Sequence, residues 1–151
     1  MKFSDLKSLK GVEKMEFKDN SKEYKELLTQ AIRRGLRAIG MTAETYAKDT
    51  CPVDTGYARN SITYALSGET TAISSYEADR GKNGKPPRTG KYSGTTGKIE
   101  DNYVVIGSNV EYFPFIEEGA RGREARHTLR KAASDHKDEY KQLITDSIKN
   151  A

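Results

Sequence analysis

Apolar residues recur in the first third of the chain at steps of three, four and one, which places them on one face of a helix. They are Tyr24, Leu27, Leu28, Ala31, Ile32, Leu36, Ile39, Ala43, Tyr46 and Ala47. Asn20 followed by Glu23 has the spacing of a capping box. Pro52 is expected to end the helix, because the residue before a proline disfavours the helical conformation. The pattern predicts an amphipathic helix of about 29 residues, roughly 43 Å long.

Three shorter segments have the pattern of strands. Residues 61–66 alternate, with Ile62, Tyr64 and Leu66 on one face. Residues 70–76 follow a Ser-Gly-Glu turn and predict a second strand. Residues 102–108 are rich in β-branched side chains and predict a buried third strand.

A second apolar stripe begins near Glu124 and predicts a C-terminal helix. Its members are Leu129, Ala132, Ala133, His136, Tyr140, Leu143, Ile144 and Ile148. The order helix, strand, strand, long loop, strand, helix indicates an α+β fold, in which a small antiparallel sheet is packed by a long N-terminal helix and a C-terminal helix. We expect residues 1–19 to form an arm and residues 20–151 to form a single α+β domain.

The long loop between the strands carries the positive charge of the protein. Residues 79–101 contain five Gly and two Pro, and predict a flexible insert. Its cations are Arg80, Lys82, Lys85, Arg88, Lys91 and Lys98, and no acidic residue lies between the first and the last of them. Without these six the chain has 20 basic and 22 acidic residues. The loop either contacts a polyanion such as DNA without reading its sequence, or is a solvated segment that keeps the protein soluble.

Composition limits the class of protein. Hydrophobic residues make up 34 % of the 151 residues and charged residues 32 %, so the core is small and part of the stability is expected from partner subunits. No apolar run reaches the length of a membrane span, and the first residues lack the apolar core of a signal peptide. The single cysteine allows no internal disulfide, which fits synthesis in a reducing cytoplasm.

The run from Cys51 to Ile62 has two incompatible interpretations. Asp54-Thr55-Gly56 is the tripeptide that carries the catalytic carboxylate of aspartic proteases, and a homodimer would supply the second carboxylate. The alternative is a structural corner between helix and strand formed by Pro52, Asp54, Thr55, Gly56 and Ser61. The preceding long helix and the following Tyr57 favour the corner, in which Asp54 accepts hydrogen bonds from backbone N–H groups.

Other candidates for chemistry are weak, and no cofactor or metal is expected. His127 and His136 are nine residues apart, which is not the spacing of a zinc pair on one helix. Cys51 has the character of a small buried residue. Glu117 and Glu118 are adjacent and point in different directions on any regular element, so they do not form an obvious acid–base pair.

Two segments in order resemble the signatures of the HK97 gp10-like tail-component proteins of tailed bacteriophages. The first is Pro52-Val-Asp-Thr-Gly56 followed by Arg59, Ser61 and Ile62. The second is Val-Val-Ile-Gly-Ser at 104–108, followed by Tyr112, Pro114-Phe-Ile-Glu117 and Gly119. The resemblance covers roughly residues 20–145.

The resemblance implies a structural virion protein without catalysis. It implies a neck or tail-completion ring, usually a hexamer, that joins the tail to the DNA-filled head. Neighbouring connector and tail-tube or tail-terminator proteins would be its partners, with genomic DNA in the channel and no membrane. The residues that would serve assembly or packing are Tyr112, Phe113, Phe115, Glu117 and Gly119. A nucleic-acid-binding module remains the alternative, and a homodimeric protease using Asp54 the remote one.

Overall fold

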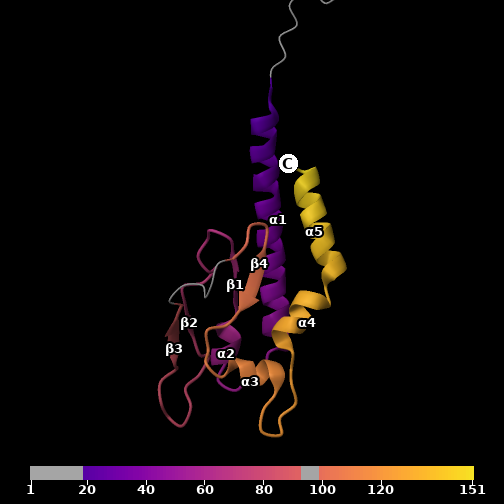
Figure 1. Ribbon diagram of the computed structural model, residues 1–151. Coiled ribbons are helices and arrows are strands. Elements are labelled where there is room, and N and C mark those ends of the chain that lie inside the picture. The colour runs from indigo at the N-terminus through magenta and orange to yellow at the C-terminus, as the bar shows by residue number, and fades with distance from the viewer. Residues whose placement is uncertain (1–18, 93–98) are drawn as a thin grey trace, which may run out of the picture.

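The computed structural model describes residues 19–92 and 99–151. A single long helix, α1 (Ser21–Thr50), forms the centre of the fold. It has 30 residues, one more than the apolar stripe predicted. Both strands of a small sheet contact α1, and so do two C-terminal helices, as Figure 1 shows. The predicted α+β class, with a small antiparallel sheet and helices at both ends of the chain, is confirmed.

The two ends of α1 differ in how well the sequence predicted them. Cys51 is extended, with φ −72° and ψ 127°, so the helix ends before Pro52 as expected. At the other end the predicted capping box is wrong. Asn20 occupies the N-cap position without a side-chain cap bond, and Oδ1 of Asp19 accepts the Ser21 N–H at 2.9 Å instead.

The strands form two separate antiparallel pairs rather than one three-stranded sheet. β1 (Thr63–Leu66) pairs with β4 (Val104–Gly107), with Thr63 opposite Gly107. β2 (Ser75–Glu77) pairs with β3 (Thr89–Lys91), with Ser75 opposite Lys91.

The second pair corrects the prediction for two segments. Of the strand expected at 70–76, only its last residues are extended, and β3 lies inside the insert at 79–101 that was expected to be a flexible loop. The hairpin forms because Tyr76 is buried against the core and its hydroxyl donates to Asn109 Oδ1 at 2.6 Å. Short polar strands such as Thr-Gly-Lys carry no pattern from which this pairing follows.

β4 is less buried than its β-branched sequence predicted. Ile106 packs against the core, whereas Val105 is 43 % exposed. The strand has β1 as a partner on one side only, and its two faces alternate between core and solvent.

The C-terminal region contains three helices where one was predicted. They are α3 (Phe113–Glu118), α4 (Thr128–Ser134) and α5 (Lys137–Lys149). The helix expected from residue 124 begins only at Thr128, because His127 adopts a left-handed conformation with φ 52°. The helix is then interrupted at Asp135 and His136, where the His136 ring stacks on the Tyr46 ring with centroids 3.5 Å apart. The break turns α5 so that it runs beside α1 (Figure 1).

The core lies where α1, α2 (Tyr57–Asn60), the strand pairs and α3 meet. Its buried members are Ala47, Cys51, Tyr57, Ala58, Ile62, Tyr76, Ala78, Val110, Phe113 and Ala132. Beyond this core, Ser147 of α5 donates its hydroxyl to the Ala31 carbonyl of α1 at 2.6 Å. Among the helices of residues 19–92 and 99–151, none combines the length and apolarity that a membrane crossing requires.

Candidate functional site

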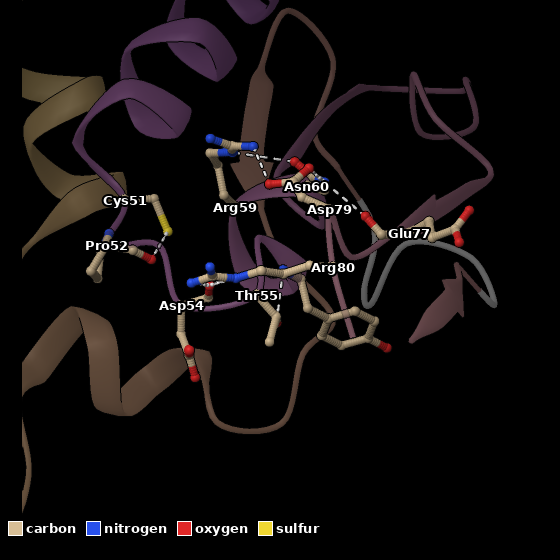
Figure 2. A network of polar contacts seen from close by, with 10 residues as sticks. Cys51, Pro52, Asp54, Thr55, Arg59, Asn60, Glu77, Asp79 and Arg80 are labelled. Carbon is tan, nitrogen blue, oxygen red and sulfur yellow. Dashed lines mark hydrogen bonds and ion pairs between the residues drawn. The ribbon is translucent and has the colours of Figure 1, made fainter. Parts of the chain in front are cut away.

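The chain turns from α1 into β1 through a corner at residues 51–61, shown in Figure 2. Gly56 has φ +81° and ψ −9°, a left-handed conformation that other residues resist. A Cβ atom at this position would also overlap the carboxylate of Asp79. The backbone and its surroundings therefore both require glycine here, as the sequence predicted.

Asp79 ties the corner to the segment that follows β2. Its backbone N–H donates to the Thr55 carbonyl at 2.8 Å. Its carboxylate accepts from Arg59 Nη2 at 2.5 Å and from Asn60 Nδ2 at 2.9 Å (Figure 2). Asn60 Nδ2 also donates to the Glu77 carbonyl at 2.7 Å. Sequence reasoning missed Asp79, because it lies about twenty residues from its partners and belongs to neither signature segment.

Asp54 does not make the bonds that the sequence predicted for it. Its side chain is 68 % exposed and accepts from Lys82 Nζ at 2.5 Å, rather than from backbone N–H groups of the corner. Its backbone carbonyl accepts from Arg80 Nη2 at 2.7 Å. The Lys82 ammonium lowers the pKa of the Asp54 carboxyl below its usual value. Asp54 thus connects the corner to the basic segment.

Ser61 joins the two signature segments. It is fully buried, and its hydroxyl lies 2.6 Å from the hydroxyl of Ser108, directly after β4. The Ser61 hydroxyl also donates to the Ala58 carbonyl at 2.7 Å, which closes the turn of α2. Cys51, at the start of the corner, is buried, and burial raises the pKa of its thiol to about 11. Such a thiol is protonated at neutral pH, so it has the character of a core residue rather than a nucleophile.

The aromatic residues of the second signature divide into buried and exposed ones. Phe113 is 3 % exposed and belongs to the core. Tyr112 is 39 % exposed and Phe115 is 63 % exposed. Gly119 has φ 76°, and a Cβ there would lie 2.6 Å from the Arg123 carbonyl oxygen, so this turn also requires glycine.

Glu117 caps helix α4. Its Oε2 accepts the Leu129 N–H at 3.0 Å and its Oε1 accepts the Arg130 N–H at 2.8 Å. Backbone N–H groups in the first turn of a helix have no carbonyl acceptor within the helix, so the Glu117 carboxylate serves as their acceptor. Glu118 points elsewhere and pairs with Arg130 Nη2 at 2.6 Å.

We expect Glu117→Ala to lower the free energy of unfolding by about 1–2 kcal/mol, because two N–H groups of α4 lose their acceptor. Glu118→Ala is the matched control, since it removes only an exposed ion pair and is expected to cost about 0.5 kcal/mol or less. Urea unfolding of the two variants measures the difference. Equal losses in both would show that capping by Glu117 contributes no stability.

Three of the predicted basic residues lie beside the corner. Arg80 and Lys82 contact Asp54, and the Arg88 guanidinium lies 4.5 Å above the centre of the Tyr57 ring. With Lys85 and Tyr112 these residues line a groove of 590 Å³. Lys91 ends β3, away from this groove, and Lys98 lies outside the described residues.

The described residues contain no group of three or more His, Cys, Asp and Glu side chains placed to hold a metal ion. His136 is engaged in the stack with Tyr46, and His127 precedes α4. The contacts of the corner have a structural role: they hold the long helix α1, the two strand pairs and the short helix α3 in fixed positions. Exposed aromatic and basic side chains lie beside the corner.

Comparison with protein families finds a match over more than half of the chain. The family model described as bacteriophage HK97-gp10, putative tail-component, matches residues 15–119, which include α1, the corner, both strand pairs and α3. No curated protein and no solved structure matches the chain. Both signature segments lie within the matched range and meet through Ser61 and Ser108. The chain belongs to the HK97 gp10-like family of bacteriophage tail components.

Proposed function

We propose that the protein is a neck or tail-completion subunit that assembles into a ring, with six copies, and joins the tail to the DNA-filled head. The family match over residues 15–119 is the observation that carries this proposal. The proposal places the protein in the neck or tail of the virion, after synthesis in the cytoplasm of the host bacterium. Its neighbours there are connector proteins and tail-tube or tail-terminator proteins.

The distribution of side chains supports an assembled state. Several large apolar residues remain exposed in the single chain, among them Tyr24, Leu27, Met41, Tyr103, Tyr112 and Phe115. Tyrosine and phenylalanine are enriched at protein interfaces, where they bury a large area at low entropic cost. We therefore assign Phe115, the more exposed ring of the second signature, to contacts between subunits. Pro52, Thr55, Gly56 and Ser61 shape the corner behind it.

A structural role also fits Asp54 better than proteolysis does. An aspartic protease needs two carboxyl groups that share a proton, which keeps one of them protonated at working pH. Asp54 has Lys82 as its partner, and this ammonium stabilises the ionised carboxylate. The environment therefore opposes the protonated state that the protease mechanism requires.

We further propose that residues 20–151 form the ring-building domain and residues 1–19 an arm, of which residues 1–18 lie outside the described residues. The basic segment from Arg80 to Lys98 is proposed to contact DNA in the channel or a neighbouring protein. A contact with DNA inside a channel requires the ring, so the assembly state is the first property to test.

Native mass measurement of the purified protein is expected to give a closed oligomer, with six times the mass of the chain. Electron microscopy of phage particles that lack the protein is expected to show filled heads and tails that are not joined. Normal joined virions without the protein would refute the proposed role. A strictly monomeric protein, both alone and mixed with the neck proteins, would refute the ring.

A further inference from the structure

A second basic segment lies outside the range that the family model matches. Residues 121–126 follow α3 and carry Arg121, Arg123 and Arg126, all exposed. The three arginines lie on and just after a tight turn. In this turn Arg121 and Gly122 have positive φ angles of 51° and 78°, and Ala120 forms an isolated antiparallel β-bridge with Arg123. The family match ends at Gly119, so an argument about this segment depends on the structure of this chain and not on the match.

The two basic segments meet at one end of the molecule. The loop between β2 and β3 and the loop between α3 and α4 extend past α2 and α3 at the same end (Figure 1). The three arginines of the second segment line a groove of 780 Å³ together with Phe115 and Tyr112. Tyr112 also lines the 590 Å³ groove of Arg80, Lys82, Lys85 and Arg88. The two grooves are therefore neighbours that share one wall.

The charge of this double groove is strongly one-sided. Its lining contains seven cationic side chains, of Arg80, Lys82, Lys85, Arg88, Arg121, Arg123 and Arg126. Only two lining residues are acidic, Asp54 and Glu124. Within residues 19–92 and 99–151, Lys82 is the one of these seven that lies within ion-pair distance of a carboxylate. Cations gathered without compensating carboxylates raise the local concentration of anions.

We propose that the double groove is a binding surface for the phosphate backbone of double-stranded DNA. The surface is formed jointly by the segments 80–88 and 121–126, with Tyr112 between them. Exposed lysine and arginine side chains on glycine-containing loops can each contact a phosphate without reading the base sequence. The inference rests on the proposed function, because that role brings the protein into contact with DNA. The positions of the charged side chains do not depend on a ring.

The test measures binding of a fluorescein-labelled 24-base-pair duplex by anisotropy, as a function of salt concentration. The first variant is R121Q/R123Q/R126Q and the second is K82Q/K85Q. The control is K22Q/K25Q/R34Q, which removes three exposed cations from the N-terminal half of α1, at the opposite end of the molecule (Figure 1). Native mass measurement of all proteins shows whether each variant keeps the assembly of the unaltered protein.

The unaltered protein is expected to bind the duplex with an affinity that falls steeply with salt. The slope of log K against log salt should become shallower by about 0.9 for each phosphate contact removed. We expect both groove variants to bind at least about tenfold more weakly at low salt, and the control to change by less than about threefold.

Three results would overturn the proposal. The first is equal binding by the unaltered protein and both groove variants, and the second is no binding of the duplex at low salt. The third is binding of poly-glutamate as tightly as of DNA at equal charge concentration, which would identify an acidic protein as the partner. Absence of DNA binding by an intact ring refutes this inference alone, whereas DNA binding by a strict monomer refutes the proposed ring alone.

Discussion

Replacement of Gly56 by valine is expected to lower the free energy of unfolding by about 3–5 kcal/mol. Two costs combine at this position. A β-branched residue is strained at φ +81°, which costs about 1–3 kcal/mol. The added side chain also overlaps the carboxylate of Asp79, and overpacking of this kind costs about 1–3 kcal/mol.

The second cost spreads beyond the glycine itself. Asp79 must move to admit the new side chain, and its carboxylate holds both Arg59 and Asn60. The corner would then lose the bonds that attach it to the segment after β2. Because 1 kcal/mol corresponds to about 2–4 °C for a protein of this size, the midpoint of thermal unfolding is expected to fall by roughly 10 °C.

Gly84→Val is the matched control for the Gly56 variant. Gly84 has a similar conformation, with φ +74°, but a Cβ there would meet no atom within 4 Å. The control therefore carries the backbone strain without the collision and is expected to cost about 1–3 kcal/mol. Calorimetry on both variants separates the two contributions. Equal losses in stability would show that the contact between Gly56 and Asp79 is unimportant.

The parts of the fold that follow from local patterns were predictable from the sequence. The stripe on α1 repeats over many turns, and Pro52 ends the helix by a local steric effect. The glycine at position 56 was predictable for the same reason, because a tight turn needs a residue that adopts a left-handed backbone conformation. Each of these features depends on residues close together in the chain.

The parts that depend on distant partners were not predictable in this way. Asp79 replaces Asp54 as the acceptor that holds the corner, and nothing near Asp79 in the sequence distinguishes it from other surface acids. The hairpin of β2 and β3 forms around Tyr76, whose hydrogen-bond partner Asn109 lies 33 positions later. The apolar stripe of the last helix continues through residues 135–136 and gives no sign that the helix is interrupted there. The interruption accompanies the packing of His136 on Tyr46, a tertiary contact that overrides the local pattern.

The candidate binding surface also depends on residues that are far apart in the sequence. The run from Arg80 to Lys98 is visible as a charge cluster, but the sequence does not show that residues 121–126 lie beside it. Tyr112 links the two only because α3 places it between the loops. The sequence also grouped Tyr112, Phe113 and Phe115 together, whereas the short helix separates them into buried and exposed positions.

Phe113 and Phe115 are expected to respond to truncation in opposite ways. Phe113→Ala removes a ring from the core and is expected to lower the free energy of unfolding by about 3–5 kcal/mol. Phe115→Ala removes an exposed ring and is expected to change the stability of the single chain by about 0.5 kcal/mol or less. Chemical unfolding at a concentration where the chain is monomeric measures both values.

Assembly should reverse this order of importance. If the exposed ring of Phe115 is buried against a neighbouring subunit or neck protein, its loss should weaken that association by about tenfold or more, as truncation of a central interface aromatic does. Sedimentation or native mass measurement of the Phe115 variant across a concentration series reports this change, with the folded state checked by circular dichroism. An unaltered ring with unaltered binding of its neighbours would remove Phe115 from the interface. The second signature would then supply no aromatic ring for assembly, since Phe113 belongs to the core and Tyr112 lines both grooves of the proposed DNA surface.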